Sequence, residues 1–179
     1  MPIRLDQFDN QDFDRGAPPG KEALWRLVRT LVFGDGLPVP SSLRVAVLRM
    51  FGAEVGEGVV IRGGCQIHFP WRLEIGDHVW IGERVTLLSL DKIIVEDHVC
   101  ISQQAFVCTG SHDFEDETFS LQTAPIHIRA HSWIGATAFL GMGVEVGKES
   151  LVSAGAVLME NCPNSSFVKG NPATIAPRR

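Results

Sequence analysis

Aliphatic residues recur every six positions through the middle of the chain. Three segments of 20 residues, beginning at Glu54, Glu74 and Ile94, repeat this spacing and then slip by two. A second array runs without slips, at Ile128, Ile134, Leu140, Val146, Val152 and Leu158. A period of six suits neither an α-helix at 3.6 residues per turn nor an amphipathic strand at 2. It predicts one short strand and one corner per six residues, so that three units close a triangular coil.

A second column of residues supports the same coil. The residue four positions after each inward aliphatic residue is small or β-branched: Val59, Cys65, Val79, Val85, Val99, Ala105, Ser132, Ala138, Val144, Ser150 and Ala156. The residue directly after the aliphatic one is often glycine, where tight backbone geometry favours a missing Cβ. Equivalent residues of successive coils should stack about 4.8 Å apart, as hydrogen-bonded strands do. The two columns predict an all-β fold, a parallel β-helix of about five coils over residues 54–179.

Two segments fall outside the repeat. Residues 110–125 are polar and acidic, which predicts a loop ejected from the coils. Residues 1–53 form an N-terminal extension with two expected helices, 21–33 and 41–52, the second with Ser41 or Ser42 as a plausible N-cap. On the first helix an apolar stripe is expected from Leu24, Leu27, Val28, Leu31 and Val32. Packing of the two helices on the open end or side of the β-helix is the favoured interpretation, and docking on a membrane surface, helped by the flanking Arg26 and Arg29, is the alternative.

Composition and charge narrow the classes of function. The net charge of −5 argues against a general nucleic-acid-binding surface. No apolar run reaches the roughly 18 residues of a membrane span, and the first residues lack the apolar stretch of a signal peptide. The four cysteines form no C-x-x-C pair, which favours reduced thiols over a metal site or disulfides. These features together predict a cytoplasmic protein.

Several segments resemble those of a known enzyme family. LEIGDHVWIGERV, SWIGATAFLGMGVEVG and KGNPA are similar to hexapeptide-repeat acyltransferases, the group of the maltose and galactoside O-acetyltransferases. FDRG, VCISQQAFVCTGSHDF and APIHI resemble the branch of the colanic acid biosynthesis acetyltransferases. The resemblance implies a left-handed coil, a homotrimer with active sites between subunits, and acetyl-coenzyme A as the acetyl donor. The implied acceptor is a hydroxyl group of a sugar or of a polysaccharide precursor.

His112 is the expected catalytic residue. It lies where the third coil gives way to the acidic loop. A sugar hydroxyl needs a base to remove its proton as it attacks, and an imidazole suits that task near neutral pH. By resemblance, His112 matches the general base of the family, and the acceptor attacks the thioester directly without an acyl-enzyme. Asp113 or a backbone carbonyl is expected to orient the imidazole.

The resemblance also implies residues that bind the two substrates. Trp133 matches a tryptophan that lines the active site, and Ser89 and Asp91 fall where relatives bind the acceptor. Small residues are expected to line the groove for coenzyme A, with a C-terminal loop closing over it: Ala136, Gly141, Ala154, Gly155, Lys169, Gly170, Asn171 and Pro172. Many relatives have Thr-Lys where this chain has Met159 and Glu160. The remaining candidates to meet the phosphates of coenzyme A are Lys148, Lys169, Arg178 and Arg179.

Two alternatives stay open from the sequence alone. A γ-type carbonic anhydrase shares the coil and needs three histidines around zinc. His78 and His98 occupy equivalent positions of adjacent coils and should stack on an outer face, whereas the spacing of His127 and His131 should not place them on one face. The second alternative is a β-helix that acts only as a scaffold. The acetyltransferase interpretation requires no metal.

Overall fold

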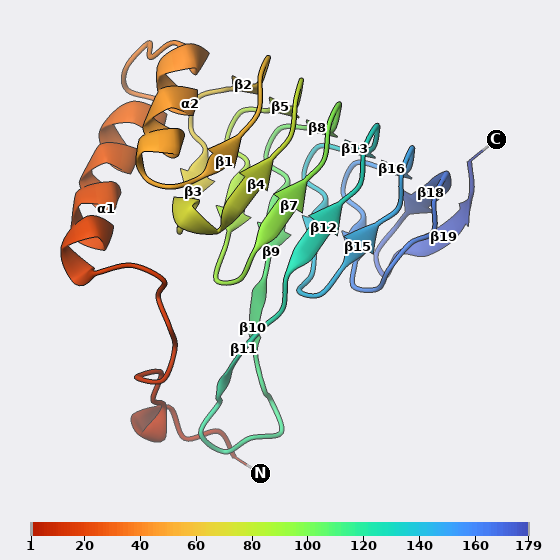
Figure 1. Cartoon of the computed structure of the whole chain (residues 1–179). Helices are drawn as coiled ribbons and strands as arrows, with labels where there is room; N and C mark the ends of the chain where they lie inside the picture. The colour runs from red at the N-terminus through yellow and green to blue at the C-terminus, as the bar shows by residue number, and fades with distance from the viewer. Residues whose placement is uncertain (1, 179) are drawn as a thin grey trace.

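The computed structural model describes residues 2–178, and they form a β-helix capped by two α-helices. The coil stack runs from the first coil, beside the helices, to the C-terminus at its opposite end (Figure 1). The coil winds in the left-handed sense that the resemblance implied (Figure 1). This hand is opposite to that of ordinary parallel crossovers, so the residue period alone could not have supplied it.

Three sheets form the faces of the coil, and successive coils contribute neighbouring strands to each. Face A contains β1 (Glu54–Val55), β4 (Leu73–Ile75), β7 (Ile93–Val95), β12 (Ile126–Ile128) and β15 (Glu145–Val146). Face B contains β2 (Val60–Ile61), β5 (Trp80–Ile81), β8 (Cys100–Ile101), β13 (Trp133–Ile134), β16 (Leu151–Val152), β18 (Ser166–Lys169) and β19 (Thr174–Pro177). Face C contains β3 (Gln66–Ile67), β6 (Thr86–Leu88), β9 (Phe106–Cys108), β14 (Phe139–Leu140) and β17 (Val157–Leu158).

The strand register follows the sequence repeat. Ile61 pairs with Ile81 and Ile81 with Ile101, all parallel, and the next coil continues through Ile134. Five full coils are complete at β17, and a sixth begins where Cys162 bridges to Val146. β19 then pairs antiparallel with β18 and ends the stack.

The two predicted columns form the interior. The aliphatic ladder is buried, and every member of the small-residue column is at most 9% exposed. Glycine is required at the corners by close approach: a Cβ on Gly135 would lie 2.5 Å from the backbone nitrogen of Ala154. The left-handed backbone conformation occurs at the third residue of a corner, as in Gly76-Asp77-His78. There it is adopted by side-chain-bearing residues such as His78 and His98, with φ of 55° and 57°.

The helices α1 (Pro19–Phe33) and α2 (Ser41–Met50) cover the open end of the first coil. Trp25 is fully buried and donates from Nε1 to the carbonyl oxygen of Ile67 at 2.9 Å. Arg44 is buried and joins the three parts, donating to Val32 O of α1 and Ile61 O of the first coil. Two short 3₁₀ helices span Leu5–Gln7 and Pro70–Arg72.

Two expectations for the helices were wrong. The stripe on α1 divides: Val28 and Val32 pack on the core, whereas Leu24, Leu27 and Leu31 are 54%, 60% and 53% exposed. The rings of Trp25 and Phe33, both fully buried, set the rotation of the helix and turn the leucines outward. Neither serine caps α2 with its side chain, because Pro40 is the N-cap residue and Ser41 Oγ accepts instead from Ile61 N of the first coil, at 2.8 Å.

Candidate active site

The ejected segment is a β-hairpin. β10 (Gly110–His112) pairs antiparallel with β11 (Leu121–Thr123), and the hairpin projects from the corner between faces C and A (Figure 1). Thr109 fixes the exit: its buried hydroxyl donates to Leu88 O at 2.7 Å and accepts from Asp91 N at 2.9 Å. Ala124 N donates to Thr109 O at 3.0 Å and closes the neck. The sequence predicted a loop here, but its alternation was too short to indicate strands.

The tip of the hairpin is held by a carboxylate. Asp116 accepts from Thr118 Oγ1 at 2.8 Å and from the backbone nitrogens of Thr118 and Ser120. Hydrogen bonds from the side chain of Ser120 first, and from the backbone and side chain of Thr118 next, lower the pKa of Asp116 to about 2. The carboxylate is therefore ionised at neutral pH and orders the turn that carries Phe119.

His112 is oriented by a backbone carbonyl. Its Nδ1 lies 2.8 Å from Phe119 O, and because a carbonyl oxygen only accepts, Nδ1 carries the proton. The lone pair of the neutral ring is then on Nε2. The two aromatic rings of His112 and Phe119 stack with centroids 4.3 Å apart, and the ring of Phe8 meets the imidazole edge-on at 5.5 Å. An imidazole fixed in this tautomer can accept a proton at Nε2.

Asp113 has other partners. Its carboxylate accepts from Glu115 N at 2.9 Å and from Gln122 Nε2 at 3.2 Å. Of the two groups expected to orient His112, the backbone carbonyl is the one that contacts it.

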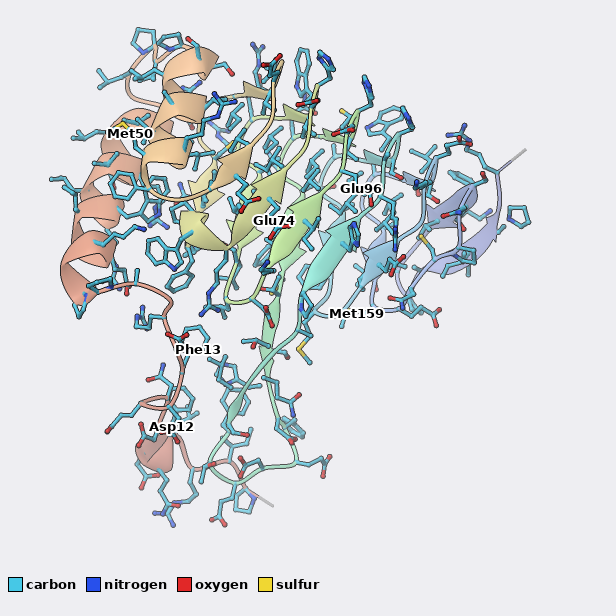
Figure 2. All side chains as sticks on the ribbon, viewed as in Figure 1. Asp12, Phe13, Met50, Glu74, Glu96 and Met159 are labelled. Carbon is cyan, nitrogen blue, oxygen red and sulfur yellow. The ribbon has the colours of Figure 1, made fainter. Side chains whose placement is uncertain are left out.

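A cavity of about 520 Å³ lies between the hairpin, the coil and the N-terminal segment. Leu121 and Thr123 contribute from β11, on the side of the hairpin that also carries His112, since Leu121 and His112 are directly paired. Figure 2 shows Asp12 and Phe13 on the N-terminal segment, between α1 and the hairpin. The lining residues are Asp9, Asn10, Asp12, Phe13, Asp14, Arg72, Asp91, Ser120, Leu121 and Thr123.

The N-terminal segment is tied to both sides of this cavity. Arg4 N donates to Glu117 O of the hairpin at 2.8 Å. Arg72 donates to Asp14 O, and Trp71 Nε1 donates to Arg15 O at 2.8 Å. Four aspartates and one arginine thus surround the cavity, which makes it acidic. FDRG, residues 13–16, resembles a motif of the family, but nothing in the motif indicates that these residues fold back against a hairpin.

Of the residues expected to bind the acceptor, only Asp91 lines this cavity. Ser89 is fully buried, where its hydroxyl accepts from Phe69 N and donates to Phe69 O, both at 3.1 Å. Ser89 therefore holds a corner of the second coil. Trp133 lies on the outer surface of face B, 53% exposed, and donates from Nε1 to Ser102 Oγ at 2.7 Å.

The residues expected to bind coenzyme A gather mostly at the corner between faces B and C. Ala136 and Ala154–Gly155 belong to successive coils there, joined by the hydrogen bond from Gly155 N to Ala136 O at 2.9 Å. The turn Gly170–Ala173 joins them, since Val157 N donates to Gly170 O. We call this surface, formed by Ala136, Ala154, Gly155 and Gly170, the small-residue ledge. Gly141 lies apart, at the corner between faces C and A, where Met159 Sδ would be 2.6 Å from an added Cβ.

A second cavity, of about 540 Å³, lies on face B near the C-terminus, and Lys169 in its lining directly precedes Gly170 of the ledge. Its floor is the apolar pair Leu151 and Phe167, which are directly registered on β16 and β18. Lys169 and Arg178 supply positive charge at its edge. A flat apolar floor with basic groups at its rim suits an adenine ring and a phosphate. Lys148 lies elsewhere, in the corner between faces A and B.

Three of the five histidines outside the hairpin form a stack at the corner between faces A and B. His78 and His98 have ring centroids 5.1 Å apart, as the repeat predicted, and His131 extends the stack at 5.0 Å. His127 instead points outward from face A, with Nε2 2.9 Å from Glu96 Oε1. Within residues 2–178, no group of three or more histidine, cysteine or acidic side chains is arranged to hold a metal ion.

Comparison with known proteins identifies the family. A model of the hexapeptide repeat of succinyl-transferases matches residues 125–160. The chain is 35% identical over 165 residues to the Escherichia coli (strain K12) protein WcaF, whose name describes it as a colanic acid biosynthesis acetyltransferase. The alignment covers 92% of this chain and 91% of WcaF. It is 22% identical to the galactoside O-acetyltransferase of Lactococcus lactis, covering 88% of this chain and 80% of the relative.

Solved structures agree. A hexapeptide-repeat acetyltransferase from Vibrio cholerae superposes with a TM-score of 0.79 at 27% identity, covering 90% of this chain and 94% of that one. Its complex with acetyl-coenzyme A has a TM-score of 0.80 at 24% identity, covering 89% and 87%, and supports the shared fold. The left-handed coil, its ejected hairpin and the extent of the match to WcaF lead to one conclusion: the chain belongs to the hexapeptide-repeat acetyltransferases.

Proposed function

We propose that this protein transfers the acetyl group of acetyl-coenzyme A to a hydroxyl of a sugar or polysaccharide precursor, with His112 as the general base. The observation that carries the proposal is the hydrogen bond between His112 Nδ1 and Phe119 O, because it leaves Nε2 as a proton acceptor. His112 does not itself line the acidic cavity, but its strand partner Leu121 does. A relative has been crystallised with acetyl-coenzyme A, which supports the choice of donor.

The acceptor cavity favours a neutral saccharide. Carboxylates accept hydrogen bonds from sugar hydroxyls, and four of them, Asp9, Asp12, Asp14 and Asp91, face one arginine. A phosphate or uronate group in this cavity would meet like charges in a partly desolvated space. The sugar ring that enters the cavity is therefore uncharged, and any charged part of a larger acceptor lies outside it.

The reaction needs one base and no covalent intermediate on the enzyme. Nε2 of His112 takes the proton as the acceptor oxygen forms its bond to the acetyl carbon. The carbon–sulfur bond then breaks, and the imidazolium returns the proton to the leaving thiolate. Burial raises the pKa of Cys65 to about 11 and raises that of Cys162 above its usual range, so these thiols are poor nucleophiles for an acyl-enzyme.

The donor site and the base lie at different corners of one chain. His112 is carried by the corner between faces C and A, whereas the ledge is at the corner between faces B and C. A homotrimer, in which the hairpin of one subunit meets the ledge of its neighbour, would bring them together. Trp133 and Lys169 then belong to the donor half of each site.

The four thiols are free, which accords with a protein working in the cytoplasm.

The decisive experiment is a thiol-release assay with acetyl-coenzyme A against neutral sugars, sugar phosphates and nucleotide-linked sugars. We expect release of free coenzyme A that depends on a neutral sugar, and mass spectrometry should show one O-acetyl group on the product. A panel in which no saccharide accelerates release, or in which only sugars with a charged group on the accepting ring do, would refute the proposed acceptor class.

A further inference from the structure

We infer that the helical cap, residues 19–50, docks the protein on an anionic phospholipid surface. This inference goes beyond the proposed reaction. It starts from the outward face of α1, where Leu24, Leu27 and Leu31 follow at spacings of three and four residues, and each is more than half exposed. On a helix these spacings put the three side chains on one face.

The second helix adds to this surface. Leu43 and Met50 on α2 are 47% and 80% exposed, at a spacing of seven residues. Figure 2 shows Met50 at the end of the molecule formed by the helices, away from the coil stack. We call these five exposed side chains, Leu24, Leu27, Leu31, Leu43 and Met50, the apolar cap face. With Leu37 in the connecting segment, the cap holds half of the twelve large apolar side chains that are exposed among the described residues.

No packing inside the chain explains the apolar cap face. The opposite sides of the helices already bury Trp25, Phe33, Val45 and Leu48 against the first coil. Large exposed apolar clusters on a soluble domain mark interaction surfaces. Within residues 2–178, no helix is long and apolar enough to cross a membrane, so the cap would lie on a bilayer surface.

Charge identifies the lipid. Residues 19–50 contain five basic and two acidic side chains, a net charge of +3, in a chain whose net charge is −5. Arg44 and Glu22 are buried, and the four basic and one acidic side chains that remain accessible also sum to +3. The remaining residues therefore carry −8, and an anionic membrane would repel them while attracting the cap. Arg26 and Arg49 are exposed on the two helices, although Arg26 pairs with Glu22 and Arg49 also donates to Val55 O of the first coil. This asymmetry orients the molecule with its helices toward the lipid. Face-to-face contact between the caps of two copies of the chain would bring two cationic surfaces together, so charge favours the lipid over a second copy.

The exposed leucine stripe and the length of α1 suit a helix that lies in a membrane interface. Such helices place leucines and aromatic residues in the acyl boundary and basic residues beside the headgroups. α1 has 15 residues and is therefore about 22 Å long, enough for four turns in the interface plane.

Co-sedimentation with vesicles tests the inference without any acetyl-transfer assay. The purified full chain is mixed with vesicles of phosphatidylcholine containing about a third phosphatidylglycerol, and separately with pure phosphatidylcholine, at low and high salt. We expect binding to the anionic vesicles at low salt, at least about tenfold weaker on pure phosphatidylcholine, and weakened by salt.

Two variants of α1 distinguish an effect of the exposed leucines from a general effect of glutamine substitutions on the helix. Leu24→Gln/Leu27→Gln/Leu31→Gln should lower the partition coefficient at least about tenfold, because three apolar contacts with the acyl boundary are lost. Ala23→Gln/Thr30→Gln places the same residue at two exposed sites of α1 outside the stripe, and should bind like the wild type. Glutamine and leucine have similar helix propensities, so both variants should keep the circular dichroism and melting temperature of the parent.

Three results would overturn the inference. The wild-type protein could fail to sediment with anionic vesicles at low salt, or the triple variant could bind as strongly as the wild type. The triple variant could also reduce the assembly size seen by light scattering in the absence of lipid, which would assign the apolar cap face to a contact between copies of the chain.

Discussion

His112 donates from Nδ1 to the carbonyl oxygen of Phe119 at 2.8 Å, and the rings of the two residues stack in parallel with centroids 4.3 Å apart. Both residues belong to the hairpin, so the turn that orders Phe119 also orients the imidazole. The backbone at Phe119 is left-handed, with φ of 55°, and this conformation presents its carbonyl to the ring. The proposed base is thus oriented by main-chain geometry, with no need for a carboxylate partner.

Removing the imidazole should affect turnover far more than donor binding. For His112→Ala we expect kcat to fall at least about 10²-fold, because general-base catalysis supplies about 10²–10⁴-fold. The affinity for acetyl-coenzyme A should change little, since the donor residues lie at another corner. Asp113→Asn is the matched control, because Asp113 contacts Glu115 and Gln122, and its kcat should stay within about threefold. Near-normal turnover of His112→Ala in steady-state assays would contradict the assignment.

Stability at acid pH should depend on Glu22. Hydrogen bonds from Arg15 first, and from Arg26, lower the pKa of this buried carboxyl to about 2, from 4.5. A depressed folded-state pKa adds stability that is fully present above about pH 4.5 and is lost as the pH falls toward 2. Both arginines are partly exposed, so we expect Glu22→Gln to lower the free energy of unfolding at pH 7 by about 1–2 kcal/mol.

Urea unfolding at a series of pH values measures this difference. The gap between the wild type and Glu22→Gln should narrow below pH 4.5 and close near pH 2. Glu54→Gln changes an exposed carboxylate on face A and should show no such gap. A gap for Glu22→Gln that stays constant down to pH 2 would mean that lost packing, and not the ionised carboxylate, causes the destabilisation.

Metal removal distinguishes the transferase from a zinc enzyme. The proposed reaction uses a base and a thioester, whereas a carbonic anhydrase needs zinc to lower the pKa of bound water to about 7. Protein treated with a strong chelator and checked by elemental analysis should keep its full acetyl-transfer rate and show no hydration of carbon dioxide. Loss of activity on stripping, recovered with stoichiometric zinc, would make the stack of His78, His98 and His131 the first place to look for ligands.

The coil could be predicted from the sequence because each inward position requires only an aliphatic side chain at a spacing of six residues. Ile61, Ile81, Ile101 and Ile134 stack in register, and the repeat requires nothing else of them. The sequence allowed a backbone carbonyl as the partner of His112 but could not identify it, because Phe119 O reaches the ring only through the register of the β10–β11 hairpin. Every residue has a backbone carbonyl group, so the pattern of residue types cannot mark the one that binds His112.

The rotation of α1 shows a second limit. Its leucines and valines form one apolar arc by sequence, yet Trp25 and Phe33 decide which side enters the core. Rings of this size bury more apolar area than a leucine, so their packing outweighs the leucine count. Ser41 shows the same effect in the hydrogen bonds, since a typical capping residue serves the first coil instead of its own helix. Tertiary contacts overrode local preference in both cases.

The acidic cavity should control the affinity for the acceptor and not for the donor. Asp12→Asn and Asp91→Asn should each raise the KM for a neutral sugar about tenfold or more, since hydrogen bonds to charged groups contribute about 1.5–3 kcal/mol. The KM for acetyl-coenzyme A should stay within about twofold. Glu115→Gln, on the hairpin but outside the cavity lining, is the control. If the KM for acetyl-coenzyme A rises together with the acceptor KM in either aspartate variant, the assignment of that residue to the acceptor cavity alone is wrong.

Mixing two inactive variants tests whether the site forms between subunits. His112→Ala removes the base, and Ala154→Trp blocks the small-residue ledge with a bulky ring on an exposed position. Each homotrimer should be nearly inactive. If each site takes its hairpin from one subunit and its ledge from the next, random mixing leaves about a quarter of the sites with both parts intact. Co-expressed variants should therefore recover about a quarter of the wild-type rate, in a particle of trimer mass by light scattering. A mixture that stays inactive, or an active monomer, would show that one chain brings its own hairpin and ledge together.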